Sequence, residues 1–380
     1  MKAIISGAGV AGLTLAARLG AAGWRVVLLE RAAGLPSPGY MIDFFGPGYT
    51  AAERLNLLGR LREVSYHIPQ IVWLDQTGTP VARLHYSNVE HALGGRLLTL
   101  MRGDLTRTLF AAVTRSTEVR FGQTIDSIHL GSGRVEVQLS DGARETGDLL
   151  VGADGMHSRV SELLLGDAQS AFHYLGLHAA AYIFEDAAIH ERLAGQFMVT
   201  STPGRQAAFF PLRAGRVAAF FSHRMPSAAL PSSAAAALSE IYKSFGWVVP
   251  SALERARGLS DIFYDSVGQI QLSRWCLGRV ALLGDACQAV SLVAAGQGTS
   301  LAVHAACVLA DELASTGSIH EALERYEQKL KPVVQQTQLR GRLAAQWFVP
   351  ATGLRLGLRN AALRVFDHRS MNWMLRPLLA

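Results

Sequence analysis

The chain has 380 residues, of which 49% are hydrophobic and 17% are charged, so it can bury more than one core and disorder is excluded as its main state. The formal net charge of +6 at pH 7 suggests an anionic partner, yet eight bases and a single acid after position 330 account for the whole excess. The rest of the chain is close to neutral, which excludes a basic body that binds nucleic acid.

The three cysteines, Cys276, Cys287 and Cys307, are odd in number and far apart. They have neither the spacing of metal ligands nor that of a disulfide framework, so we expect no metal site and a reducing compartment, the cytoplasm. The N-terminal segment lacks the order of regions found in a signal peptide. No uncharged apolar run is long enough to predict a membrane span.

The N-terminal segment predicts a complete βαβ unit. Lys2–Ser6 is a short apolar run typical of a buried parallel strand, and Leu13–Ala22 is a helical segment with small residues on one side. Trp24–Leu29 is a second buried strand, which ends at Glu30. Strand, helix and strand follow one another in the order of a nucleotide-binding unit.

A glycine motif joins the first strand to the helix. Gly7 permits the tight turn, Gly9 lets a pyrophosphate approach the backbone at the helix N-terminus, and Gly12 lets the helix pack on the strand. Glu30 stands where a carboxylate binds the ribose hydroxyls of an adenosine. Because strand, helix, strand and acid are all in place, the motif predicts a dinucleotide site rather than a glycine-rich turn without a ligand.

Further elements follow in chain order. The pattern predicts helices over residues 51–62 and 102–114, a hairpin over 71–84, two strands within 118–139, and a third buried parallel strand over 148–153. Between residues 168 and 272 the βαβ rhythm stops, and a predicted hairpin over 206–224 and a helix over 234–245 indicate an antiparallel sheet. A buried strand over 279–283 and a helix over 300–315 then lead into a mostly helical C-terminal part.

These elements predict an α/β fold in which a Rossmann-like domain with a parallel sheet is interrupted by a second domain with a mainly antiparallel sheet. We assign the nucleotide-binding domain to residues 1–70, 96–167 and 273–335, the inserted substrate domain to 71–95 and 168–272, and a basic amphipathic helical segment to 336–380.

Two later motifs narrow the choice of dinucleotide. Leu149–Ser158 carries Asp154-Gly155 after a strand, and Gly278–Ala286 carries Gly284-Asp285 after another, followed by Gly296-Gln297-Gly298. With the first motif, their order and spacing resemble the single-component FAD-dependent monooxygenases, the family of p-hydroxybenzoate hydroxylase and of the tetracycline-inactivating hydroxylases. The resemblance covers residues 1 to about 315.

The resemblance implies FAD as cofactor and assigns roles to matching positions. Glu30 would bind the adenosine ribose, Arg102 the diphosphate side, and Asp285 the ribityl or diphosphate part, while the helix that starts at Gly296–Gly298 would face the flavin pyrimidine. Asp43, in the segment Gly39–Asp43, would lie beside the isoalloxazine. The predicted cofactor-binding set is Gly7, Gly9, Val10, Ala11, Gly12, Glu30, Arg31, Asp43, Arg102, Asp154, Gly284, Asp285, Gly296, Gln297 and Gly298.

The resemblance also implies the reaction. NADPH or NADH would bind transiently and reduce FAD, O2 would add at flavin C4a, and the hydroperoxide would hydroxylate or epoxidise an aromatic or polycyclic small molecule, in secondary metabolism or antibiotic modification. Because the cofactor carries the chemistry, no catalytic side chain is assigned. The oligomeric state stays open.

Gln288 and Leu292 depart from the histidine and proline that family members often carry there. They motivate an alternative, a flavoprotein of the same fold that performs dehydrogenation or cyclisation in natural-product assembly. A non-catalytic protein that binds FAD or another ligand is a further alternative.

The substrate pocket is predicted from aromatic residues in the antiparallel region. Alternate residues of a strand face opposite sides, so one of Phe209 and Phe210, and one of Phe220 and Phe221, should line it, with Leu292. Three other residues have a structural interpretation as well as a functional one. His157 either contacts the cofactor or has no functional role, and both possibilities stay open. His304 is interpreted as packed or exposed to solvent, and Cys287 as a small residue that fills space in the core.

The basic C-terminal segment has two interpretations. The apolar face of a predicted helix has Leu354, Leu358, Ala361, Ala362 and Val365, and the adjoining face has Arg355 and Arg359. The favoured interpretation is an amphipathic helix packed across the two domains through its apolar face. The other is contact with a membrane surface, or a route for an acidic substrate or NADPH.

Overall fold

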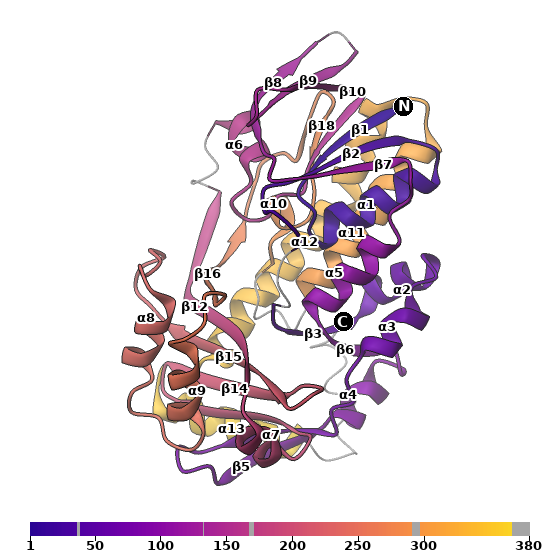
Figure 1. The fold of residues 1–380 in the computed structure, drawn as a ribbon. Coiled ribbons are helices and arrows are strands. Elements are labelled where there is room, and N and C mark those ends of the chain that lie inside the picture. Colours follow the sequence, from indigo (N-terminus) through magenta and orange to yellow (C-terminus); the bar gives the residue numbers. More distant parts are fainter. Residues whose placement is uncertain (36–38, 132, 167–170, 291–296, 367–380) are drawn as a thin grey trace.

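The structure, a computed structural model, describes residues 1–35, 39–131, 133–166, 171–290 and 297–366 (Figure 1). A parallel sheet and a largely antiparallel sheet organise these residues, and a long helix near the C-terminus contacts both. The α/β class predicted from the sequence is confirmed.

The first sheet has six strands in the order β17-β18-β11-β1-β2-β7, and all neighbours except β17 and β18 are parallel. Its central strands are apolar runs whose side chains are buried on both faces, as expected of a sheet covered by helices. The strands are β1 Lys2–Ser6, β2 Arg25–Glu30, β7 Thr117–Phe121, β11 Leu149–Gly152, β17 Cys276–Leu277 and β18 Val280–Leu282.

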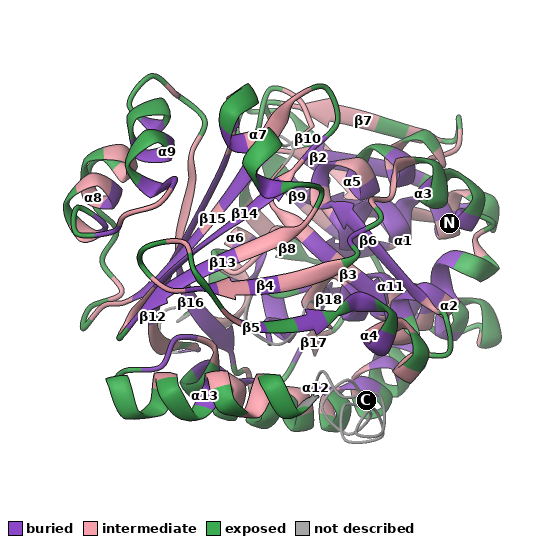
Figure 2. Cartoon of the chain, turned by 90° about the horizontal axis from the view of Figure 1, so that it is seen from below, coloured by how far each residue is buried: buried purple, intermediate pink, exposed green. Residues whose placement is uncertain are grey.

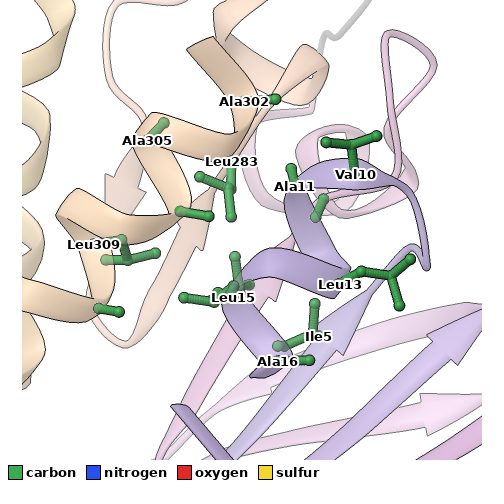
Figure 3. Packing of buried hydrophobic residues seen from close by; sticks show 14 of the residues in the cluster. Ile5, Val10, Ala11, Leu13, Leu15, Ala16, Leu283, Ala302, Ala305 and Leu309 are labelled. Carbon is green, nitrogen blue, oxygen red and sulfur yellow. The ribbon is translucent and has the colours of Figure 1, made fainter. Parts of the chain in front are cut away.

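Helices α1 (Val10–Ala21), α5 (Arg102–Ala111) and α11 (Gln297–Ser315) belong to the layer beside this sheet. Small side chains bring α1 and α11 close together, and Figure 3 shows Ala11 and Leu15 of α1 beside Leu283 and Ala302. This cluster is the largest core of the described residues, and it fixes the end of α1 at which the glycine motif lies.

The second sheet has seven strands in the order β16-β12-β15-β14-β13-β4-β5, and only the β13–β4 pair is parallel. One face is covered by three short helices, α7 Ala187–Leu193, α8 Ala234–Ile241 and α9 Val249–Ala256. The strands are β4 Gln70–Leu74, β5 Pro80–His85, β12 Phe172–Glu185, β13 Phe197–Thr202, β14 Arg205–Pro211, β15 Arg216–Arg224 and β16 Phe263–Ile270.

Smaller elements complete the described fold. The strand pairs are β3 Met41–Phe45 with β6 Leu97–Met101, and β8 Ile125–Leu130 with β9 Val135–Leu139 and β10 Arg144–Gly147. The remaining helices are α2 Gly46–Arg54, α3 Leu58–Val64, α4 Tyr86–Ala92, α6 Arg159–Leu165, α10 Asp285–Gln288, α12 Ile319–Phe348 and α13 Gly353–Phe366.

Helix α12 ties the two sheets together. Near its start Tyr326 donates a hydrogen bond to the carbonyl of Leu282 in the parallel sheet, at 2.9 Å. Further along, the buried Gln338 amide donates to the carbonyl of Ile270 in the antiparallel sheet, at 2.7 Å. In the described residues no helix is both long and apolar enough to cross a membrane.

Two predicted elements differ from the structure. The single helix expected over 51–62 is two helices, because Asn56 takes a left-handed conformation with φ of 57° that ends α2 before α3 begins. The two strands expected within 118–139 are three, since the first of them, β7, joins the parallel sheet while β8 and β9 form a separate ribbon.

The C-terminal helix α13 packs in the opposite sense to the one predicted. Leu354 and Leu358 are 76% and 52% exposed, whereas Arg359 is only 7% exposed. The Arg359 guanidinium donates to the Ser201 hydroxyl at 3.1 Å and to the Phe348 carbonyl at 3.3 Å, and burial lowers its pKa to about 10. Its long apolar stem and its hydrogen bonds let an arginine fill the position that the pattern gave to leucine.

A buried histidine and tyrosine cluster lies under α8. The Tyr264 hydroxyl is 2.9 Å from Nε2 of His223 and 3.2 Å from Nδ1 of His178, and the Tyr242 hydroxyl is 3.3 Å from Nδ1 of His223. Burial, with help from the nearby positive charge of Arg205, lowers the pKa of His223 to about 4. The folded protein therefore holds His223 neutral at pH values where the unfolded chain protonates it.

This cluster makes a pH-dependence prediction. Between about pH 6.5 and pH 4 the unfolded state binds a proton that the folded state does not, so the free energy of unfolding falls as pH falls. His223 alone accounts for about 2 kcal/mol of that loss between about pH 7 and pH 5. Urea unfolding of wild type and His223→Gln at both pH values measures it. A variant with an equally steep loss would contradict the assignment.

Candidate functional site

The three sequence motifs meet at one edge of the parallel sheet. The registers pair Ser6 of β1 with Gly152 of β11, and Gly152 with Leu282 of β18. Each motif follows directly on its strand, so the glycine turn and both acidic turns lie side by side at the carboxyl ends. In open α/β sheets this edge is where ligands bind.

The glycine turn is built as the spacing predicts. Gly7 has φ of 107°, and a Cβ there would lie 2.4 Å from the carbonyl oxygen of Ala153. A Cβ at Gly12 would lie 1.9 Å from the oxygen of Gly7, so the helix and the turn are in closest contact there. A Cβ at Gly9 would meet no atom within 4 Å. Gly9 therefore leaves an open approach to the backbone.

The N-terminus of α1 suits an anion. Gly9 is its N-cap, no side chain caps it, and its first turn has no acidic residue. Val10 and Ala11 are buried in that first turn, so their contribution is the backbone N–H groups, which have no partner within the helix.

Glu30 ties the glycine turn to the end of β2. Its Oε2 accepts a hydrogen bond from the Ala8 N–H at 2.8 Å, and its Oε1 accepts from the Ala32 N–H at 2.9 Å. Each oxygen keeps a lone pair for a further donor. Arg31, the next residue, is exposed.

Asp154 holds the second turn. Its carboxylate accepts from the Ser158 hydroxyl at 2.5 Å and from the Val160 N–H at 3.2 Å. Burial raises its pKa, with the Ser158 bond acting against that shift. Gly155 beside it has φ of 84°. The structure therefore gives Asp154 a part in shaping the loop.

Arg102 and Asp285 face this edge from two different elements. Arg102 begins α5, is half-buried, and places its guanidinium 5.9 Å from the centre of the Tyr40 ring. Asp285 begins α10 and is exposed. Desolvation raises the pKa of the Asp285 carboxyl, the Arg102 charge lowers it, and the Asp265 charge raises it. Neither side chain has a hydrogen-bond or ion-pair partner among the described residues.

Two other predicted residues lie in supporting positions. Asp43 on β3 accepts hydrogen bonds from the Thr99 hydroxyl at 2.7 Å and from Tyr86, and burial raises its pKa. Gly284 has φ of 64°, and a Cβ there would lie 2.7 Å from the Cβ of Ala11, so a glycine is needed where α10 meets α1. Gln297 and Gly298 begin α11, while Gly296 and Leu292 lie outside the described residues.

The aromatic residues separate into two faces of the antiparallel sheet. Phe209 and Phe221 are fully buried beneath α8 and α9, in the core that holds Tyr242, so their place in the predicted pocket is not retained. Phe210 stacks on Phe197 with ring centres 3.7 Å apart, and Phe220 lies 6.1 Å from Tyr40. Phe210 and Phe220 are therefore the pocket candidates.

The sequence analysis assigned no role to three residues near Phe220, namely Tyr40, Phe263 and Asp265. The Tyr40 ring lies 5.5 Å from that of Phe263 on β16. Burial raises the pKa values of Tyr40 and Asp285, and the charge of Asp265, two residues further along β16, adds a smaller rise to both. The sequence signal that could have identified Asp265 was an acid within a strand of mainly apolar residues. The pairing with Tyr40 depends on how the two sheets meet, which no local pattern encodes.

Comparison with known proteins agrees with this geometry. A family model described as FAD binding domain matches residues 65–340. FAD-dependent monooxygenase asL4 of Sarocladium schorii is 25% identical over 99% of this chain and 95% of its own, and an uncharacterised protein of Mycobacterium tuberculosis (strain CDC 1551 / Oshkosh) is 31% identical over 84% and 86%. The structure of Klebsiella pneumoniae HpxO with FAD and uric acid has a TM-score of 0.82 at 25% identity, covering 100% and 97% of the two chains.

The chain belongs to the FAD-binding-domain family of flavin monooxygenases. It is an FAD-dependent monooxygenase, an oxidoreductase. The tetracycline destructase Tet(51) shares the fold, with a TM-score of 0.79 at 24% identity over 96% of each chain.

The residues present fit the family's cofactor. A dinucleotide needs a close approach to backbone N–H groups, which Gly9 leaves open, and a counter-charge for its diphosphate, which the unpartnered Arg102 guanidinium can supply. Among the described residues no cluster of acids, histidines and cysteines could hold a metal ion.

The other candidates from the sequence are Cys287, His157 and His304, and none of them has the surroundings of a catalytic group. Cys287 is 1% exposed, and burial raises the pKa of its thiol well above the usual value, as expected of a packed filler. His157 is exposed, with Nε2 3.7 Å from Asp265. His304 is half-buried, and burial lowers its pKa.

Gln288, which motivated a different reaction, has both ends of its side-chain amide bonded within the protein. Its Nε2 donates to the Tyr326 hydroxyl on α12 at 2.6 Å, and its Oε1 accepts from the Gly284 N–H at 3.3 Å. The side chain is 2% exposed. Gln288 therefore fastens α10 to α12, and its identity gives no support to another reaction type.

Replacing Gln288 tests this interpretation. Gln288→Ala leaves the Tyr326 hydroxyl and the Gly284 N–H without this partner, so we expect the free energy of unfolding to fall by about 1–3 kcal/mol. The ratio of oxygenated product to NAD(P)H consumed should stay at the wild-type value. Urea unfolding and product analysis measure the two. Wild-type stability with a changed product ratio would place Gln288 in the chemistry instead.

Proposed function

We propose that this flavin monooxygenase hydroxylates or epoxidises an aromatic or polycyclic small molecule, with NADPH or NADH as electron donor, in secondary metabolism or antibiotic modification. The observation that carries the proposal is the arrangement of Arg102 and Asp285 beside Tyr40, with Phe220 and Phe263 of the antiparallel sheet facing that ring. Charged groups for a dinucleotide thus adjoin an aromatic surface for a planar substrate.

Each residue group at the carboxyl edge of the parallel sheet would have its own role in holding FAD. The backbone at Gly9 and the N-terminus of α1 would receive the diphosphate, and the Arg102 guanidinium would add a charge-assisted hydrogen bond. The remaining lone pairs of Glu30 would accept from the adenosine ribose, and Asp285 would accept from the ribityl hydroxyls. When bound, FAD supplies the redox and oxygen-activating chemistry, so no protein nucleophile is required.

The aromatic surface has a separate role. The Tyr40 ring lies near those of Phe220 and Phe263 on the antiparallel sheet, and the three would offer ring faces to an aromatic substrate. The apolar cluster that holds Phe210 would limit access of water to the reacting atoms. The HpxO structure, which holds uric acid, is a relative with a small organic molecule bound. The division into domains at 71–95 and 168–272 stays our proposal.

Two measurements test the function. A panel of aromatic and polycyclic compounds is screened for those that stimulate NAD(P)H oxidation by the FAD-loaded protein, and the product is then formed under isotopically labelled O2. We expect one labelled oxygen atom in the product. A product oxidised without labelled oxygen would replace this function by dehydrogenation or cyclisation. FAD binding with no stimulated oxidation by any compound of the panel would favour a non-catalytic role.

A further inference from the structure

A cleft lies on the face of the antiparallel sheet that points away from Tyr40. Its volume is about 410 Å³, within the range of small-molecule sites. The lining comes from β4, β5, β13 and α7, together with Trp247 before α9, and it includes Val72, Leu74, Arg83, Arg192, Met198 and Trp247.

Strand register places this cleft on the α8 and α9 face. Val72 of β4 pairs with Arg83 of β5 on one side and with Met198 of β13 on the other, and Met198 pairs with Phe209 of β14. Paired residues share a face, so this row runs from the buried Phe209 outward to Arg83. Figure 2 shows β4 and β5 side by side along this edge of the sheet.

The helix layer ends at Trp247. Its ring meets the Phe209 ring edge-on, with centres 5.6 Å apart, so it closes the core on that side. Beyond it, the buried Val72 and Leu74 and the half-buried Met198 form an apolar floor that lines the cleft. The cleft therefore has an indole ring as one wall and aliphatic side chains as its floor, and Thr77 and Gln196 add polar groups to its lining.

The backbone of Trp247 is strained in a way that holds the ring at this position. Its φ is 57°, in the left-handed region that a bulky residue rarely adopts. A Cβ at Gly78 would lie 2.6 Å from Cδ1 of the indole, so only glycine opposite leaves room for it. Strain of this kind persists where the surrounding structure enforces it, and it is concentrated at ligand sites.

The charges of the cleft are uncompensated. Arg83 and Arg192 are exposed, and neither guanidinium has a hydrogen-bond or ion-pair partner within the described part of the chain. The lining has no carboxylate. The nearby Asp75 carboxylate is engaged by the Thr77 and Thr79 N–H groups at 2.8 and 3.0 Å. The cleft thus places two unpaired arginines beside an apolar floor and an indole ring, and this arrangement suits a bound anion.

We propose that this cleft binds a planar aromatic anion, a ring system that carries a carboxylate, sulfonate or phosphate group. The ring packs between the Trp247 indole and the floor, and the anionic group is held by Arg83 and Arg192. The site is separate from the flavin edge, because its residues face the opposite side of the sheet from Phe210 and Phe220. It would let a second small molecule bind while the flavin site is loaded.

The probe for the test is 8-anilinonaphthalene-1-sulfonate, added to the FAD-loaded protein and followed by fluorescence titration. The double variant Arg83→Gln/Arg192→Gln should bind it at least about 10-fold more weakly, since two charge-assisted contacts are lost. The matched control is Arg60→Gln/Arg115→Gln, two exposed arginines outside the cleft, which should bind as wild type. N-phenyl-1-naphthylamine, the uncharged analogue, should bind wild type at least about 10-fold more weakly than the sulfonate.

A further variant tests the wall independently of charge. Trp247→Gly removes the indole, and glycine accepts the left-handed backbone without strain. We expect it to lose sulfonate binding while its circular dichroism stays that of wild type. The proposal is overturned if both arginine pairs bind equally, if the neutral analogue binds as well as the sulfonate, or if Phe220→Ala, on the flavin side, abolishes binding while the cleft variants retain it.

Discussion

Gly9→Leu is expected to abolish FAD binding and to leave the protein folded. Gly9 has an ordinary φ of −78°, and a Cβ there would meet no protein atom within 4 Å, so the fold gains no clash and no strain. The leucine side chain would instead occupy the approach to the α1 N-terminus, where the diphosphate must lie against the backbone. We expect the affinity for FAD to fall at least about 100-fold, or about 2.7 kcal/mol.

The measurement is the dissociation constant for FAD by flavin fluorescence, together with the thermal midpoint of the FAD-free protein. Gly12→Ala is the matched control, because a Cβ there would lie 1.9 Å from the oxygen of Gly7 and must displace the turn. It should lower the thermal midpoint, whereas Gly9→Leu should not. A Gly9→Leu protein that keeps FAD with wild-type affinity would show that the cofactor does not approach the chain here.

Arg102→Met should weaken FAD binding by about 100-fold. The half-buried guanidinium has no protein partner among the described residues, so its loss leaves no protein group unsatisfied and the fold should keep its stability. Charge-assisted hydrogen bonds to a diphosphate contribute about 1.5–3 kcal/mol, which sets the size of the loss. Arg102→Lys retains the charge without the two-pronged geometry and should fall between the two proteins.

The dissociation constant for FAD is measured for all three proteins, with the urea midpoint as a check on folding. Arg60→Met serves as the control, since it removes an exposed arginine of α3, away from the motif edge. Equal affinity in Arg102→Met and wild type would remove Arg102 from the diphosphate site. A lowered urea midpoint in Arg102→Met would show instead that the arginine has a structural role.

Much of the fold could be predicted from local sequence patterns. The βαβ unit could be predicted because the constraints on Gly7, Gly9 and Gly12 act within a few residues of one another, and the buried strands before Asp154 and Asp285 could be predicted because parallel strands are apolar on both faces. Their meeting at one edge follows from the rule that parallel strands end on the same side.

The rest depended on contacts between distant segments. The alternation of side chains along a strand predicted that Phe220 and Phe221 face opposite sides of the sheet. Only the packing of α8 and α9 decides which of these sides is the core. The helix α13 was predicted to bury leucines, whereas the polar partners Ser201 and Gln206, distant in sequence, make Arg359 the residue that is buried. Gln288 looked like a departure at the reaction centre until its bond to Tyr326 placed it in the packing of α12.

The most direct test of the flavin site at the carboxyl edge of the parallel sheet is the FAD content of the purified protein after incubation with FAD and removal of the unbound cofactor. We expect wild type to retain FAD in an amount equimolar with the protein, and Gly9→Leu of equal circular dichroism to retain almost none. A wild-type protein that is folded yet retains no FAD, or a Gly9→Leu protein that retains as much, would contradict the assignment.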